Sequence, residues 1–134
     1  MQLKRIFPAM AMLLTTAHAW AEVAVIVNPK NPVNKMTADD ASQYFLGKST
    51  QLTPCDYPQG TALRGDFYSK GLEKEPAQVK AIWTKLLFTG KGVAPREYAS
   101  VAEMKKAVSA NVNAIGYIDK AAVDDSVKVV LTLP

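Results

Sequence analysis

The sequence predicts a layered α/β domain, and three observations carry this prediction. Two continuous β-branched runs, at 23–27 and 127–133, have the length and composition of strands that are buried on both faces. Between them, segments with helical spacing of apolar residues alternate with short strand-like runs. Apolar residues make up 49% of the 134 residues, which is enough for one hydrophobic core. Such alternation is typical of helices packed on a sheet.

The expected elements are bounded by turn and capping residues. The expected strands are 23–27, 51–57 (weakened by Pro54), 114–118 and 127–133. The expected helices are 37–47, 61–72, 76–88 and 100–108, with a single helical turn at 119–123. The segment 93–99 is expected to be a loop.

Several helix starts follow from residue type. Thr37 and Asp40 form a short acidic capping box, and Ser100 and Glu103 form a full one. Pro76 suits the first turn of a helix. The helix that follows Pro76 has the most regular apolar spacing in the chain, carried by Val79, Ile82, Trp83, Leu86 and Leu87.

The first 21 residues have the composition of an export signal. Lys4 and Arg5 precede a short apolar run at 6–14, and overlapping Ala-x-Ala triplets follow it. The run is shorter than the roughly 20 residues of a membrane-spanning helix, which disfavours a retained anchor. We therefore expect cleavage after Ala19 or Ala21, a periplasmic protein, and one domain over residues 22–134.

Loss of that segment changes the chemistry that remains. The net charge falls from +4 to +2 because Lys4 and Arg5 leave, and His18, the single histidine, leaves with them. Weak charge and export argue against a nucleic acid partner. Cys55 is left without a second cysteine and is expected to be a small buried strand residue.

The remaining residues do not favour an enzyme or a cofactor. Acid–base catalysis needs a histidine or paired carboxylates in a pocket. The acidic pairs at 39–40 and 124–125 lie at an expected helix start and an expected turn, where aspartate has structural roles. No nucleophile-elbow, zinc-protease or P-loop motif occurs. We expect no catalytic residue, no metal site and no cofactor.

A binding site is better supported. Gln59, Gly60 and Thr61 lead into an expected helix, whose free N–H groups favour an anion, and Gly60 allows close approach to the backbone. Arg64 lies three residues after Thr61 and can bind an oxyanion through two hydrogen bonds. The loop 89–92 is a second candidate, with helix capping as its alternative role. Tyr117 is expected to be a strand residue with one edge in water.

Several motifs together resemble the phosphate-binding substrate receptors of ABC transporters. They are spread over most of the chain after residue 21, and the most specific are 45–48 and 111–117. The motifs are Tyr44-Phe45-Leu46-Gly47-Lys48, Gly60-Thr61, Phe67-Tyr68, Trp83, Gly90-Lys91-Gly92 and Ala114-Ile115-Gly116-Tyr117-Ile118. The chain resembles even more strongly a group of short exported, phosphate-receptor-like proteins that hold one lobe of this fold.

The resemblance implies a single lobe of a type II periplasmic-binding-protein-like fold, with a central mixed sheet flanked by helices. It also implies a non-enzymatic solute-binding protein for phosphate or a related oxyanion. Its partners would be an ABC transporter membrane subunit or a second chain that completes the cleft. Two differences keep an alternative open, because the family's Gly-Ser-Gly-Thr turn is Gln59-Gly60-Thr61-Ala62 here and its preceding arginine is replaced by the Cys55-Asp56-Tyr57 stretch. The alternative is a periplasmic interaction module that kept the fold and lost the ligand.

Overall fold

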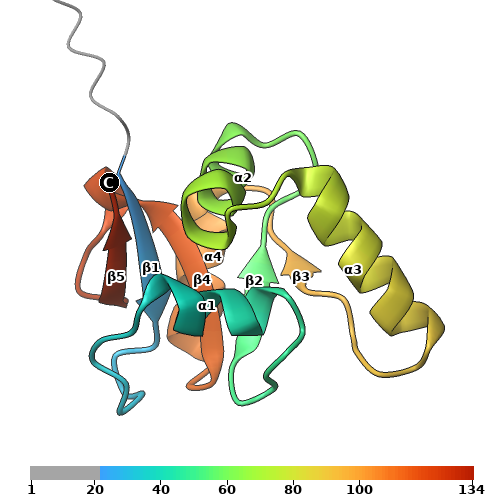
Figure 1. Cartoon of the computed structure of the whole chain (residues 1–134). Helices are drawn as coiled ribbons and strands as arrows, with labels where there is room; N and C mark the ends of the chain where they lie inside the picture. Colours follow the sequence, from blue (N-terminus) through green and yellow to red (C-terminus); the bar gives the residue numbers. More distant parts are fainter. Residues whose placement is uncertain (1–21) are drawn as a thin grey trace, which may run out of the picture.

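A computed structural model of the protein describes residues 22–134, and the expected export signal at 1–21 lies outside the described residues. The sheet has five strands in the order β3-β2-β4-β1-β5 (Figure 1). The strands are β1 (Val23–Val27), β2 (Thr53–Asp56), β3 (Arg96–Glu97), β4 (Ala114–Asp119) and β5 (Lys128–Leu133).

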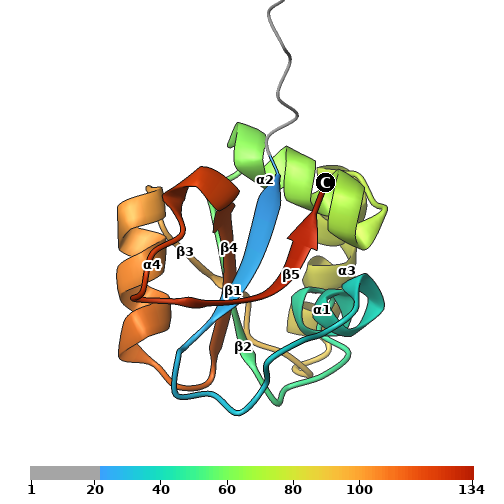
Figure 2. The same cartoon turned by 90° about the vertical axis from the view of Figure 1, so that its left-hand side faces the viewer.

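The sheet is mixed, as expected. β1 pairs antiparallel with both β4 and β5, whereas β2 is parallel to β3 and β4. All five residues of β1 are fully buried, which confirms the interpretation of the 23–27 run. Figure 2 shows β1 next to β5, and Val23 at the start of β1 pairs with Leu133 at the end of β5.

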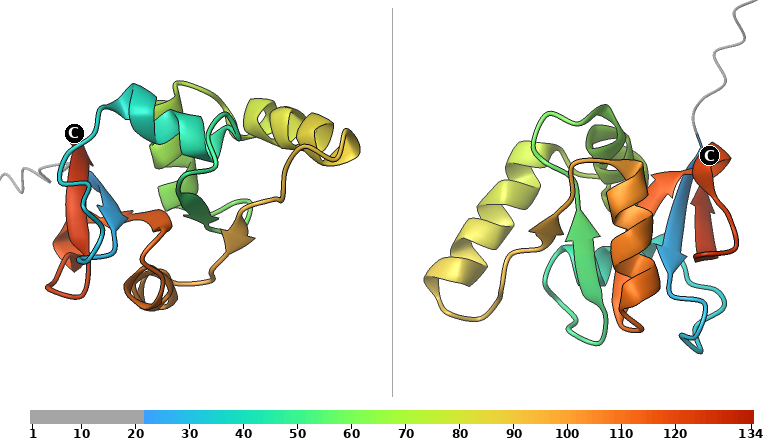
Figure 3. Two further views of the ribbon diagram at one scale, coloured as in Figure 1. Left: turned by 90° about the horizontal axis from the view of Figure 1, so that it is seen from below. Right: turned by 180° about the vertical axis from the view of Figure 1, so that it is seen from behind.

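Helices cover both faces of the sheet. Figure 3 shows α4 on one face, α1 and α2 on the other, and α3 beyond the edge strand β3. The helical segments are α1 (Ala38–Phe45), α2 (Ala62–Phe67), the π-helical turn η1 (Tyr68–Leu72), α3 (Pro76–Phe88), α4 (Val101–Ala110) and the 3-10 turn η2 (Lys120–Ala122). Within residues 22–134, no helix has the length and apolar character needed to cross a bilayer.

The local start signals act largely as expected. Thr37 and Asp40 form both hydrogen bonds of the capping box at the start of α1. Ser100 accepts the Glu103 N–H at the start of α4, but the Glu103 carboxylate accepts the N–H of Ala99 instead of that of Ser100. The expected loop 93–99 is wrong in one place, because Arg96 and Glu97 form β3 against the edge of β2.

The core joins the sheet to α1 and α2 through aromatic rings. Tyr117 of β4 stacks on Phe67 of α2 with 3.9 Å between ring centroids, and Phe45 of α1 meets both rings edge-on. All the buried hydrophobic residues of the described chain lie between Val23 and Leu133. The buried residues of the described chain form one hydrophobic cluster.

The indole of Trp83 fastens α3 to this core. Its Nε1–H donates to the Phe45 carbonyl at 2.8 Å, and the ring lies close to Gly47 and Gly92. A Cβ atom on Gly47 would come within 2.5 Å of Leu86 and 3.3 Å of Trp83, and Gly47 has a φ of 72°. Gly47 is therefore needed both for its left-handed backbone and for the space that α3 occupies.

Candidate functional site

The carboxyl ends of two parallel strands place acidic side chains next to the start of α2. Asp56 ends β2, Glu97 ends β3, and the two residues are paired in the sheet. α2 begins six residues after Asp56 and carries Arg64 as its third residue. Ligands of open α/β sheets bind at this end of the strands, so the sheet itself directs attention here.

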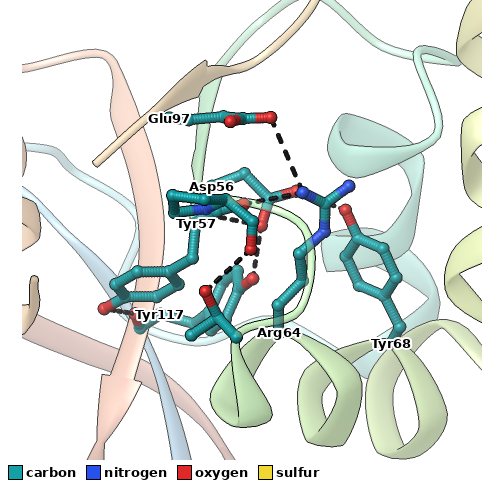
Figure 4. Close-up of polar contacts among 8 residues, drawn as sticks. Asp56, Tyr57, Arg64, Tyr68, Glu97 and Tyr117 are labelled. Carbon is teal, nitrogen blue, oxygen red and sulfur yellow. Dashed lines mark hydrogen bonds and ion pairs between the residues drawn. The ribbon is translucent and has the colours of Figure 1, made fainter. Parts of the chain in front are cut away.

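Asp56 is a buried carboxylate with three hydrogen-bond donors. It is 4% exposed, and one carboxylate oxygen accepts the Tyr57 N–H at 2.8 Å and the hydroxyl of Tyr117. The other oxygen accepts the hydroxyl of Tyr68 (Figure 4). These donors replace the water that the charge loses on burial, which is the condition for holding a carboxylate inside a protein. We call Asp56, Tyr68 and Tyr117 the Asp56 cluster.

The tyrosines of the Asp56 cluster donate their hydroxyl protons to Asp56. Burial, followed by the negative charge of Asp56, raises the pKa of Tyr117 and of Tyr68 well above the ordinary value. Both hydroxyls therefore keep their protons at any physiological pH. The expectation that Tyr117 has an edge in water is wrong, because its side chain is fully buried and its hydroxyl is bound to Asp56.

Arg64 lies beside this cluster and already has partners. Its Nη1 donates to the Tyr57 carbonyl at 2.7 Å and lies 3.6 Å from the Glu97 carboxylate, while its guanidinium carbon is 5.1 Å from the centre of the Tyr68 ring. Burial lowers the pKa of Arg64, but the Asp56 charge together with Tyr68 and Tyr117 outweighs this effect and raises the pKa. Arg64 is therefore a fixed cation, and its buried Nε has no hydrogen-bond partner among the described residues.

The turn before α2 is open to solvent. Thr61 N–H donates to the Pro58 carbonyl at 3.2 Å, and Gly60 has a φ of 90°, as a turn with glycine at its third position requires. A Cβ on Gly60 would meet nothing within 4 Å. The Thr61 hydroxyl does not cap the helix, because it donates to the Pro58 carbonyl at 2.7 Å. That hydroxyl can accept a hydrogen bond from a ligand, but its proton is already used.

Arg64 lines a small cavity of about 250 Å³ between the strand ends and α3. Asp56, Glu97 and Tyr68 share this cavity with residues of α3 and of the loop before β3. The α3 residues are both apolar and polar, and they include Lys80 and Thr84. A cavity of this size suits an ion or a small polar group and not an extended ligand. Gln59, Gly60 and Thr61 do not line it, so among the described residues the predicted site is divided between an exposed turn and a half-enclosed arginine.

The residues predicted from the sequence are therefore close in the chain but differ in how far a ligand in solvent can reach them. Gln59 and Gly60 are exposed and Thr61 is half-buried. Sequence reasoning did not find the roles of Tyr68, Tyr117 and Glu97, which reach the site from three further elements. One signal was present for Asp56, since an acidic residue directly after a strand marks the carboxyl end of the sheet.

The second candidate, loop 89–92, is a helix cap. Gly90 N–H donates to the Leu87 carbonyl at 3.2 Å and Lys91 N–H to the Leu86 carbonyl at 3.0 Å, with a φ of 71° at Gly90. These are the two hydrogen bonds of a Schellman motif. The backbone donors that an anion would need at Gly90 and Lys91 are thus already used.

The described residues offer little support for a metal site or a reactive cysteine. No group of three or more histidine, cysteine, aspartate or glutamate side chains within 22–134 is arranged to hold a metal ion. Cys55 is buried in β2, and burial raises the pKa of its thiol to about 11. Its side chain therefore belongs to the core, as expected.

The arrangement of sheet and helices is that of one lobe of a periplasmic binding protein, which confirms the fold class expected from the sequence. No protein-family model and no curated protein sequence matches the chain. The comparison with solved structures is informative. One match is a protein from Clostridium perfringens described as a phosphate ABC transporter substrate-binding protein, with bound phosphate. It has a TM-score of 0.66 and 24% identity, over 82% of this chain and 45% of that one.

Two further solved structures agree. An ABC-type phosphate transport receptor from Vibrio cholerae matches with a TM-score of 0.64 and 21% identity, over 82% of this chain and 46% of that one. PstS from Borrelia burgdorferi matches with a TM-score of 0.63 and 12% identity, over 82% and 47%. The chain thus spans about half the length of the solved proteins it matches. These similarities establish the fold. They confirm, for the fold, the resemblance that the sequence motifs indicate.

Proposed function

We propose that this chain is an exported, non-enzymatic solute-binding protein whose single lobe binds phosphate or a related oxyanion. The ligand would meet the turn Gln59-Gly60-Thr61 and the Arg64 guanidinium, and the chain would serve an ABC transporter. The observation that carries the proposal is the position of Arg64, a largely buried cation at the carboxyl end of the strands in a fold shared with a phosphate-bound protein. Backbone N–H groups at the open turn would add donors.

Glu97 is the group that an oxyanion would replace. The Arg64 side chain is 12% exposed, but that of Glu97 is 53% exposed, so their ion pair lies at the edge of the site. Exposed ion pairs contribute little to stability, and an incoming phosphate can therefore displace the Glu97 carboxylate at small cost. The hydrogen bond from Arg64 to the Tyr57 carbonyl can remain and orient the guanidinium toward the ligand.

Binding by one lobe is expected to be weak. Two-lobed receptors enclose a ligand from both sides and exclude water, whereas this chain offers one side only. The nearby Asp56 charge also opposes an anion. We expect a dissociation constant in the millimolar range, about −4 kcal/mol of binding free energy. A second chain that completed the cleft would tighten it.

Titration calorimetry on residues 22–134 with phosphate, sulfate and acetate tests the proposal. Arg64→Gln should abolish the heat of phosphate binding and Thr61→Val should weaken it, while Glu97→Gln should tighten it severalfold by removing the competing carboxylate. Arg96→Gln is the matched control, since Arg96 is an exposed arginine of β3 outside this cavity. Submicromolar binding by a monomer would contradict the one-lobe argument, and unchanged binding in Arg64→Gln would place the ligand elsewhere.

A second candidate function is an interaction module that kept the fold and lost the ligand. Its specific support is the Arg64 environment, because the Tyr57 carbonyl and the Glu97 carboxylate already engage the guanidinium. Asp56 adds a buried negative charge beside it. If residues 22–134 give no heat with any of the three anions at millimolar concentration, the solute-binding proposal fails and this candidate stands.

A further inference from the structure

The end of α3 and the loop that follows it expose large apolar side chains to solvent. Phe88 is 91% exposed, Val93 is 87% exposed and Leu87 is 47% exposed. They are three of the four exposed large hydrophobic residues in the described part of the chain. They lie within seven residues of the chain, at the last turn of α3 and in the loop that follows it. Exposed large apolar side chains of this kind on a small protein are characteristic of an interaction surface. We call Leu87, Phe88 and Val93 the α3 tip.

The chain around the α3 tip carries positive charge only. Residues 76–96 contain Lys80, Lys85, Lys91 and Arg96 and no aspartate or glutamate. The other residues of 22–134 have ten lysines and arginines against twelve acids. The whole positive excess of this part of the chain therefore lies on α3 and the loop to β3. Among the described residues, none forms an ion pair with the three lysines.

The shape of this region favours a lipid surface over a protein groove. α3 extends away from the sheet beyond β3, and its last turn forms an outer corner of the molecule (Figure 1). The Schellman motif at Gly90 reverses the chain immediately after Phe88, so the corner is a compact, internally hydrogen-bonded turn. A stable protein interface needs about 800 Å² on each partner, whereas a bilayer accepts a few protruding apolar side chains.

We propose that the α3 tip docks the protein on membranes that contain anionic phospholipid. Phe88 and Val93 enter the boundary between headgroups and acyl chains, and the ammonium groups of Lys85 and Lys91 bind lipid phosphates. Long lysine side chains suit this arrangement, since their stems lie along apolar surface while the charge stays in the headgroup layer. The attraction of each lysine falls with added salt, because it acts through the surface potential of the membrane.

Vesicle co-sedimentation of residues 22–134 tests the proposal, with phosphatidylcholine vesicles that contain roughly one-third phosphatidylglycerol. Binding should be measurable on these vesicles and much weaker on pure phosphatidylcholine. Phe88→Ser/Val93→Ser should lower the partition coefficient roughly tenfold or more. Lys85→Gln/Lys91→Gln should lower it roughly fivefold per charge, with a smaller dependence on salt.

Val112→Ser/Lys106→Gln is the matched control. Lys106 is exposed on α4, and Val112 is 45% exposed in the turn that follows α4. α4 covers the face of the sheet opposite to α1 and α2 (Figure 3). This variant should bind as the wild type does. All replaced side chains are exposed, so circular dichroism should show each variant folded.

Two results would overturn the proposal. One is no binding to anionic vesicles by the folded wild type. The other is binding that survives Phe88→Ser/Val93→Ser while polyglutamate competes for it, because the surface would then recognise an acidic protein and not a membrane. The test is independent of oxyanion binding, since none of the four substituted residues lines the Arg64 cavity or the turn at 58–61. Leu87, which does line that cavity, is left unchanged.

Discussion

Removal of the Tyr117 hydroxyl tests whether the Asp56 cluster holds the fold together. In Tyr117→Phe the ring can keep its stacking on Phe67, and only the hydrogen bond to the Asp56 carboxylate is lost. The carboxylate is buried, so water cannot take the place of the missing donor. A hydrogen bond to a charged group contributes about 1.5–3 kcal/mol, and we expect the free energy of unfolding to fall by about this amount.

The measurement is urea unfolding followed by circular dichroism, with extrapolation to zero denaturant. The thermal midpoint should fall by roughly 4 °C for each kcal/mol lost. Tyr68→Phe should have an effect of similar size, and the two substitutions should be coupled by about 0.5–3 kcal/mol because both hydroxyls bind one carboxylate.

Tyr44→Phe is the matched control, since Tyr44 is a half-buried tyrosine of α1 outside the Asp56 cluster. It should change the stability by no more than about 0.5 kcal/mol. If Tyr117→Phe costs no more than this control, the Asp56 carboxylate does not depend on its tyrosine donors and the reasoning is refuted.

Two further predictions concern α4 and its contacts. Gly116→Ala should destabilise the fold by about 1–3 kcal/mol in urea, because a Cβ on β4 would come within 2.6 Å of the Met104 sulfur; an unchanged midpoint would show that α4 can move away freely. Asp124→Asn should reduce the loss of stability that the protein shows as the pH falls below about 4. Hydrogen bonds from Lys105 and then Ser126 lower the pKa of Asp124 to about 2 from 3.8, so this carboxylate's stabilisation is present above about pH 4 and is lost as the pH falls to about 2. Urea midpoints at several pH values between these limits measure the effect, and equal slopes for variant and wild type would contradict it.

Local signals account for the parts of the fold that the sequence predicts well. The β-branched run of β1 and the capping box of Thr37 and Asp40 depend on neighbours within a few residues, so they can be read without the tertiary structure. β3 could not be read this way. Arg96 and Glu97 show no apolar alternation, and they form a strand because the edge of β2 offers them hydrogen-bonding groups some forty residues away in the chain.

The apolar periodicity of α3 also predicts more burial than the structure shows. The stripe at Val79, Ile82, Trp83 and Leu86 predicts α3 correctly, but Val79 is the only fully buried residue of that helix. Periodicity reports which face of a helix is apolar and not how much of the sheet remains to cover it. α3 lies beyond the sheet edge, so Ile82, Trp83 and Leu86 stay partly exposed.

The candidate site shows the same division between local and distant information. The turn at Gly60 and the cation at Arg64 follow from a few adjacent residues, and the structure contains both. The partners of Arg64 and Asp56 cannot be inferred from adjacent residues, because Glu97 and Tyr117 lie on other strands. The distance in the chain between Asp56 and Tyr117 leaves no spacing from which their contact could be inferred.

The attachment of α3 through Trp83 has a consequence for local unfolding. One fully buried valine, the indole hydrogen bond and the partly buried side chains of Ile82 and Trp83 hold this helix, whereas β1 is enclosed by strands on both sides. The free energy needed to detach α3 is therefore a fraction of that needed to unfold the sheet. Amide hydrogens of α3 should exchange with solvent through partial opening while those of β1 await global unfolding. The segment that carries the α3 tip can then change its angle to the sheet without loss of the core.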